Sequence, residues 1–190
     1  MDSFIFSKEK ALDADTCETL IDGFKKHIWF QEPGQSGYGI SEHKVSTDIT
    51  LHGFQQSSEH KKLYDVLLDA VKEWQYKYEG LRDLPPWSIG YGYNLQWYKP
   101  GEGYFAKHCE WATDEECVGR IAAWMFYLND VEEGGETTFT QQNINLKPRQ
   151  GDLHIFPSYW THLHHGVVAP KEDKFIATGW IELVADKNYG

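Results

Sequence analysis

The chain has 190 residues, the size of one domain, and its 41% hydrophobic and 15% aromatic residues are enough for a substantial core. Its 18 basic and 29 acidic residues give a net charge of −11 without a Lys/Arg cluster, which disfavours a nucleic-acid-binding protein. Three cysteines without metal-type or redox spacing, and a start without a long apolar run, predict a cytoplasmic protein with no membrane anchor.

Two amphipathic helices are predicted in the first part of the chain. Between Asp15 and His27 the apolar residues recur at spacings of three and four, and we expect Asp15 to cap this helix with Glu18 answering three residues later. A second segment with helical spacing begins near Ser57 or Ser58. The front of the chain is therefore expected to be mainly helical.

After the paired prolines at 85 and 86, short alternating segments divided by Gly, Pro and Asp predict β-strands and turns. The stretch Gln31–Gly39, between the helices, is predicted to be a loop. We predict one domain over residues 1–190, with a helical support region at 1–86 and a double-stranded β-helix (jelly-roll) core at 87–185, the helices bracing one outer face. The candidate strands are Tyr91–Tyr98, Tyr104–His108, Arg120–Asn129, Glu136–Phe139, Asn143–Leu146, Asp152–Phe156, His162–Val168 and Lys174–Leu183.

His108 and Glu110 form a His-x-Glu pair at the end of a candidate strand. Residues two apart share one face of a strand, so the imidazole and the carboxylate can converge while Cys109 points away. Far downstream, the segment WTHLHHG supplies three more histidines. Two histidines and one carboxylate that leave other coordination positions open suit ferrous iron that must also bind O2 and a cosubstrate. Taken alone, so short a pattern occurs often by chance.

The segments around these residues carry an ordered series of further motifs. In order they are Tyr98, Pro100, Gly101 and Tyr104, then Tyr127–Asn129, Gly134–Thr137, Lys147, Pro148, Gly151 and Asp152, and finally Phe156–Ser158. This series resembles the prolyl 4-hydroxylase-like branch of the 2-oxoglutarate/Fe(II) oxygenases over about residues 90 to 183. So many ordered elements are specific for the family, although they do not specify the substrate.

The resemblance implies that His108, Glu110 and one late histidine are the iron ligands. We choose His164, because a basic residue ten positions on, Lys174, and a tryptophan sixteen positions on then match the branch spacing; His162 is the fallback. The branch normally has aspartate where Glu110 stands. Glutamate is one methylene longer but remains an anionic oxygen ligand, and its presence disfavours a halogenase, in which a small residue leaves room for halide.

The resemblance also implies a binding site for 2-oxoglutarate. Lys174 would pair with the far carboxylate of this cosubstrate, and Tyr98 and Tyr127 resemble tyrosines that help to hold it. For each tyrosine a packed core position is the rival interpretation. Strand alternation then predicts that Thr178 and Trp180 face the same pocket.

The implied function is hydroxylation of an unactivated C–H bond with Fe(II), 2-oxoglutarate and O2, with ascorbate as a further candidate cofactor. Branch analogy favours a prolyl residue in a peptide or protein as substrate; the alternatives are a free amino acid or small metabolite, and a non-catalytic metal-binding sensor or scaffold. We expect the stretches 31–48 and 111–118 to close over the site, and leave Arg120 open between pocket and surface. Four tryptophans could form an aromatic wall for a proline ring, although some of them must be core, namely Trp97, Trp111, Trp124 and Trp160.

Overall fold

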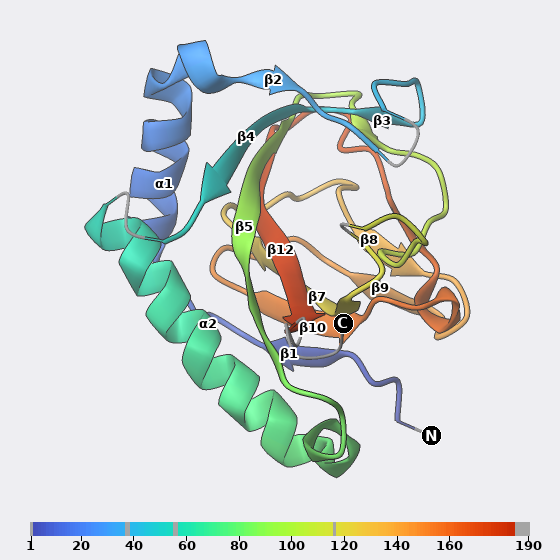
Figure 1. The fold of residues 1–190 in the computed structure, drawn as a ribbon. Helices are drawn as coiled ribbons and strands as arrows, with labels where there is room; N and C mark the ends of the chain where they lie inside the picture. Colours follow the sequence, from blue (N-terminus) through green and yellow to red (C-terminus); the bar gives the residue numbers. More distant parts are fainter. Residues whose placement is uncertain (1, 37–38, 55–56, 116, 185–190) are drawn as a thin grey trace.

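The computed structural model describes residues 2–36, 39–54, 57–115 and 117–184, and these residues form three β-sheets, of seven, three and two strands, and two α-helices (Figure 1). The expected domain end at residue 185 lies outside the described residues. The large antiparallel sheet has the order β1 (Phe6–Lys8), β10 (Leu153–Pro157), β7 (Arg120–Tyr127), β12 (Lys174–Leu183), β5 (Trp87–Tyr98), β4 (Thr47–His52) and β2 (Glu32–Pro33). The small sheet has the order β11 (His164–Gly166), β8 (Thr137–Phe139) and β9 (Ile144–Leu146), and β3 (Lys44–Val45) pairs with β6 (Gly103–Tyr104).

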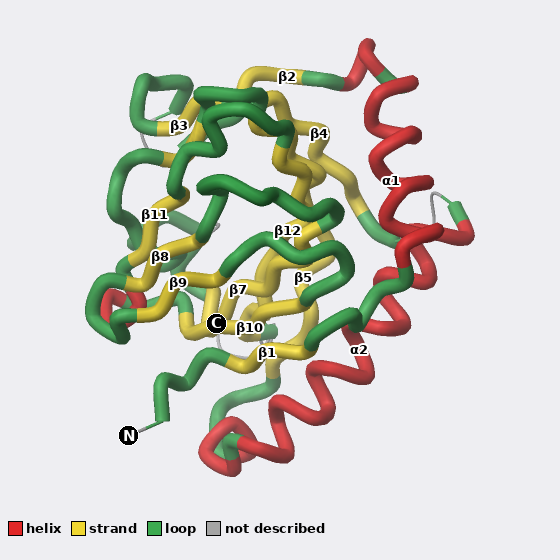
Figure 2. Tube along the Cα trace, turned by 180° about the vertical axis from the view of Figure 1, so that it is seen from behind, coloured by secondary structure: helices red, strands yellow, loops and turns green. Residues whose placement is uncertain are grey.

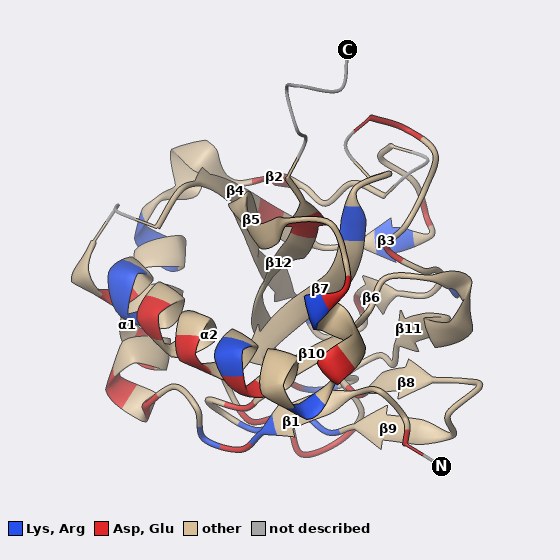
Figure 3. Ribbon diagram, turned by 60° about the horizontal axis from the view of Figure 1, so that its bottom comes forward, with Lys and Arg blue, Asp and Glu red and all other residues tan. Residues whose placement is uncertain are grey.

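The helices and the small sheet lie on opposite sides of the large sheet (Figures 1 and 2). The helices are α1 (Ala14–Lys26) and α2 (Ser58–Lys77), and short 3-10 turns span Ile28–Phe30, Glu79–Arg82 and Trp160–His162. Both signs of charge alternate along the outer side of α2 (Figure 3), as on a solvated helix surface. Among the described helices, none is long and apolar enough to cross a membrane. The arrangement confirms the predicted jelly roll braced by N-terminal helices.

The start of α1 differs from the expected cap. The capping residue is Asp13, whose carboxylate accepts a hydrogen bond from the Thr16 backbone N–H at 3.0 Å, so the expected pairing of Asp15 with Glu18 is wrong. Asp15 lies in the first helical turn instead, where its negative charge faces the positive end of the helix dipole. The expected start of α2 is confirmed, with Ser57 as the capping residue.

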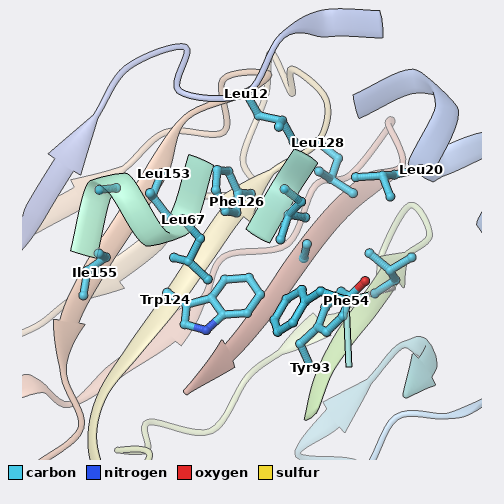
Figure 4. Close-up of a cluster of buried hydrophobic side chains, with 14 of the residues drawn as sticks. Leu12, Leu20, Phe54, Leu67, Tyr93, Trp124, Phe126, Leu128, Leu153 and Ile155 are labelled. Carbon is cyan, nitrogen blue, oxygen red and sulfur yellow. The ribbon is translucent and has the colours of Figure 1, made fainter. Parts of the chain in front are cut away.

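Alternation along β7 divides the buried side chains into two clusters. Trp124 and Phe126 face the helices, where they pack with Leu67 of α2 and Tyr93 of β5 (Figure 4). Met125 and its alternate neighbours face the small sheet. Each fully buried side chain of this size stabilises the fold by roughly 1.5–3 kcal/mol. The sheet therefore has an apolar layer on both faces, and the inner layer surrounds the candidate site.

Four short strands in the front of the chain were not predicted, because they are brief or carry polar residues. Of these, β1, β2 and β4 pair within the large sheet and β3 pairs with β6, so the region before residue 86 is not only helical. The expected loop Gln31–Gly39 contains β2. The expected strand Tyr104–His108 is also wrong in extent: β6 ends at Tyr104, and His108 is reached through irregular backbone.

Candidate active site

Three side chains with metal-binding atoms converge between the two sheets. One atom from each of His108, Glu110 and His164 lies within 4.8 Å of the others. His164 begins β11, and His108 forms an isolated antiparallel bridge opposite it, with each backbone N–H donating to the other's carbonyl at 2.9 Å. The structure thus brings the three expected ligands together. The fallback, His162, lies in a 3-10 turn and its Nε2 donates to the Ser3 carbonyl at 2.9 Å, outside this cluster.

Hydrogen bonds to the backbone fix the orientation of both imidazoles. Nδ1 of His108 lies 2.9 Å from the Ala106 carbonyl, and Nδ1 of His164 lies 2.9 Å from the His162 carbonyl. A carbonyl oxygen only accepts, so in each ring Nδ1 carries the proton, and a neutral ring presents the Nε2 lone pair to the cluster. The Tyr104 ring stacks on His108 at a centroid distance of 3.6 Å and holds that ring in place.

Glu110 directs its two carboxylate oxygens at different neighbours. Oε1 lies 3.5 Å from Nε2 of His108 and 3.3 Å from Nε2 of His164, whereas Oε2 accepts a hydrogen bond from the Trp180 indole at 2.8 Å. Burial raises the pKa of Glu110, but hydrogen bonds and positive charge from the two imidazoles, when their Nε2 atoms carry protons, outweigh it and hold this pKa well below its usual range. The carboxylate is therefore charged at neutral pH.

This donor set fits a divalent metal ion. Because both Nδ1 protons are donated to carbonyls, neutral rings turn their two Nε2 lone pairs toward the carboxylate oxygen, and these three atoms then need a shared cation, either a proton or a metal ion. Two imidazoles and one carboxylate are the set that suits ferrous iron with open coordination positions. Fe(II) thus matches the residues that are present.

The cluster lines a cavity of about 540 Å³, and Lys174 lines the same cavity. Lys174 is 5% exposed; its ammonium donates to the Gly135 carbonyl at 3.1 Å and lies 4.8 Å from the centre of the Tyr98 ring. Burial lowers its pKa from 10.5 to about 8, against the opposing effect of Glu136. No described carboxylate lies within 4.0 Å of this ammonium, so it fits an anionic ligand such as the far carboxylate of 2-oxoglutarate.

The predicted inward face of β12 lines the same cavity. Lys174, Thr178 and Trp180 all contribute to the lining, as alternation requires. Tyr98 lies opposite Lys174 in the β5–β12 register and also lines the cavity, with its hydroxyl donating to Gln96 at 2.7 Å. The hydroxyl of Thr178 is occupied by the Trp124 carbonyl at 2.8 Å, so this side chain contributes mainly its methyl group.

Tyr127 is not among the residues that line the cavity, so its expected contact with the cosubstrate stays a prediction. It is fully buried between the sheets, where its hydroxyl donates to Thr137 or the Leu146 carbonyl and accepts from the Thr137 backbone N–H. With these hydrogen bonds the phenol is satisfied inside the core. The rival interpretation, a packed core tyrosine, describes this residue.

Of the four tryptophans considered for an aromatic wall, some are core as expected, and none lines the cavity. Trp124 and Trp97 pack on the helix side of the large sheet, and Trp160 is 71% exposed. Trp111 is half-buried, lies outside the cavity lining and donates its indole N–H to the Val118 carbonyl at 3.2 Å. The tryptophan that lines the cavity is Trp180.

Polar residues from the stretches 31–48 and 111–118 form part of the cavity wall. Lys44 and Asp48 make a buried ion pair at 2.7 Å, and Lys44 lines the cavity with Gln35 and Ser36. No pattern in the sequence distinguished this pair from exposed charges. Asp114 and Cys117 line it from the second expected loop; residues 37, 38 and 116 of the two loops lie outside the described residues.

Arg120 lines the cavity. Of the two positions left open for it, pocket and surface, the structure shows the pocket. Its guanidinium lies over the Trp180 ring at 3.6 Å from the centroid and donates to the Glu110 carbonyl at 3.3 Å. Cys109 also reaches the lining, although its thiol lies 3.5 Å from the Trp111 carbonyl and is no member of the ligand cluster.

Comparisons with known proteins agree with this geometry. A family model described as the 2OG-Fe(II) oxygenase superfamily matches residues 93–182. Probable prolyl 4-hydroxylase 3 of Arabidopsis thaliana is 30% identical over 202 residues, covering 90% of this chain and 67% of the relative. Probable prolyl 4-hydroxylase 9 of the same plant is 32% identical over 121 residues, covering 50% of this chain and 42% of the relative.

Among solved structures, the viral collagen prolyl hydroxylase of Paramecium Bursaria Chlorella virus-1, in its 2OG complex, superposes with a TM-score of 0.71. It is 23% identical, and the match covers 95% of this chain and 97% of that one. This likeness establishes the fold. The chain spans between two fifths and two thirds of the length of the two plant relatives.

Proposed function

This chain belongs to the prolyl 4-hydroxylase-like 2-oxoglutarate/Fe(II) oxygenase superfamily, and from that premise we propose that it is a dioxygenase that hydroxylates a prolyl residue in a peptide or protein. One observation carries the proposal. A single cavity contains two imidazoles and a carboxylate that require a cation, and a buried ammonium that requires an anion. A ferrous ion and 2-oxoglutarate would satisfy these two requirements together.

In this proposal His108, Glu110 and His164 hold the iron, and Lys174 binds the far carboxylate of 2-oxoglutarate beside Tyr98. When bound, Fe(II) with 2-oxoglutarate and O2 supplies the oxidising chemistry that converts a C–H group to C–OH, with release of succinate and CO2. The chain contributes neutral imidazoles with fixed tautomers, a charged carboxylate and a pocket wall of β12 side chains. Burial of the ammonium strengthens its attraction for a carboxylate, because little water screens it.

The choice of a prolyl peptide rests on the relatives. The similar plant proteins are named as prolyl 4-hydroxylases, and the similar viral structure is that of a collagen prolyl hydroxylase. The cavity lining includes Asp114, which is exposed at the surface. A chain segment that carries one proline can therefore approach the cavity from the surface. A cytoplasmic location, with Cys17, Cys109 and Cys117 as free thiols, remains part of the proposal.

The test is succinate formation with Fe(II), 2-oxoglutarate and O2, measured with proline-containing peptides and with free proline. We expect peptides to stimulate turnover and free proline to leave it at background. Stimulation by free amino acids or small metabolites alone would replace the peptide with a small substrate. Failure of Fe(II) and 2-oxoglutarate, added without O2, to give a weak visible charge-transfer band in folded protein would favour a non-catalytic scaffold.

A further inference from the structure

Trp180 lies beside the candidate iron ligands but offers no ligand atom itself. We propose that it is a positioning residue: its indole N–H holds Oε2 of Glu110, so that this longer carboxylate presents only Oε1 to the metal. The inference rests on the proposed function, because it concerns the same metal site. It concerns the glutamate at position 110, which is one methylene longer than the aspartate of the resembling branch.

The two oxygens of Glu110 have different neighbours. Oε1 faces Nε2 of His108 and Nε2 of His164 at 3.5 and 3.3 Å. Oε2 is turned to Nε1 of Trp180 at 2.8 Å, a good length for a hydrogen bond to a carboxylate. Indole N–H groups only donate, so this contact does not compete with the imidazoles for a metal ion. It removes Oε2 from the cluster and leaves Oε1 available.

Trp180 is itself held firmly. It lies on β12, opposite Ala123 of β7 in the large sheet. The Arg120 guanidinium covers its ring at 3.6 Å, and the same guanidinium donates to the Glu110 main-chain carbonyl at 3.3 Å. The three residues thus form a closed ring of contacts that joins the carboxylate, the indole and the guanidinium. Such a ring restrains the ligand before a metal arrives.

Glutamate needs this restraint more than aspartate does. Its side chain has one more rotatable bond, so a free carboxylate samples more positions and can turn both oxygens to one ion. A metal that takes both oxygens has fewer positions left for other ligands. Aspartate is shorter by one methylene, so from the same backbone position its carboxylate cannot contact the imidazole cluster and the indole in the same way. The indole should therefore matter for Glu110 and much less for an aspartate there.

The experiment measures Co(II) binding and its visible d–d spectrum in wild type, Trp180→Phe, Glu110→Asp and the double variant. Phenylalanine keeps an aromatic ring under Arg120 but removes the N–H. We expect Trp180→Phe to raise the Co(II) dissociation constant about 10- to 100-fold, as loss of a partner to a metal ligand does, and to change the spectrum. In the Glu110→Asp background the same change should cost less than about threefold, because the two residues act as a coupled pair.

Trp97→Phe is the matched control. The Trp97 indole also donates to a carboxylate, Asp173, at 2.9 Å, but on the helix side of the large sheet. This variant should bind Co(II) as wild type does. The metal-induced rise in Tm, taken against the metal-free Tm of each variant, repeats the test for a variant that is partly destabilised.

Wild-type Co(II) affinity and spectrum in Trp180→Phe would overturn the inference and leave the proposed function intact. An equal loss in the wild-type and Glu110→Asp backgrounds would also overturn it, because the indole would then act by packing alone. If wild type binds no metal while folded, the proposed function fails first, and the inference fails with it.

Discussion

The two ends of the cavity are built in opposite ways. At one end, two Nε2 atoms converge with the Glu110 carboxylate, and when both rings are neutral none of the three atoms donates a proton. At the other end, the Lys174 ammonium is buried beside a carbonyl and a phenol ring with no described carboxylate within reach. Each end is unfavourable alone, since unpaired buried charge is costly. The site therefore favours the binding of a cation at one end and of an anion at the other.

The largest expected effect follows from removing one of the three candidate metal ligands. His108→Ala should reduce succinate formation to background, because two ligands are left and the geometry for three is lost. Turnover and the far-ultraviolet circular dichroism spectrum are measured together. His162→Ala is the control and should keep turnover, because this ring hydrogen-bonds to Ser3 away from the cluster. Unfolding of His108→Ala would indicate a structural metal site instead.

The next largest effect is expected at Lys174, where the change should affect 2-oxoglutarate binding without removing a metal ligand. Lys174→Met should raise the dissociation constant for 2-oxoglutarate about 100-fold, equivalent to about 2.7 kcal/mol. The same change should stabilise the ligand-free protein by about 1–3 kcal/mol at pH 7, because it removes a buried cation whose pKa is depressed from 10.5 to about 8. Denaturant unfolding and calorimetric binding measure the two quantities.

Lys171→Met, at an exposed lysine paired with Glu133, is the control and should change neither quantity appreciably. A lower unfolding free energy of ligand-free Lys174→Met would show that the ammonium stabilises the fold. Lys174 would then not be a buried cation without a partner.

A smaller effect concerns pH. Because the folded pKa of Lys174 is about 8, the ligand-free ammonium loses its proton as pH rises above that value. Affinity for 2-oxoglutarate should therefore fall by up to about tenfold per pH unit above pH 8. The sign for stability is opposite: the unfolded chain binds more protons between pH 8 and 10.5, so the Lys174 contribution to unfolding free energy rises over this range. Calorimetric titrations from pH 7 to 10 would detect the fall, and a constant affinity would speak against Lys174 as the anchor.

The smallest effect on binding is expected for Tyr127→Phe. The phenol is satisfied in the core, so the 2-oxoglutarate dissociation constant should change less than about threefold, while stability falls by about 1–2 kcal/mol through the hydrogen bonds lost with Thr137 and Leu146. Binding and Tm are compared with those of Tyr98→Phe, whose hydroxyl belongs to a residue that lines the cavity. A larger binding loss for Tyr127→Phe than for Tyr98→Phe would reverse the assignment.

The sequence predicted those parts of the site whose spacing follows from a single strand. Lys174, Thr178 and Trp180 share a face of β12, and alternation placed them correctly. The suggested roles of Trp97 and Trp124 had no such spacing behind them, and because both faces of the large sheet are apolar, the sequence does not tell which face meets the helices. The convergence of His108 and His164 depends on a bridge between distant residues, so spacing along the chain could suggest but not establish it.

One strand carries side chains of both ends, since β12 bears Lys174 near its start and Trp180 farther along. Side chains alternate between the two faces of a strand, so a slip of β12 by a single residue against β5 and β7 would turn both side chains toward the helices at once. Between them, a Cβ at Gly179 would come within 2.6 Å of the Trp124 ring, which bars most larger residues from this position. Correct alignment of this one strand during folding therefore assembles both halves of the site in the same event.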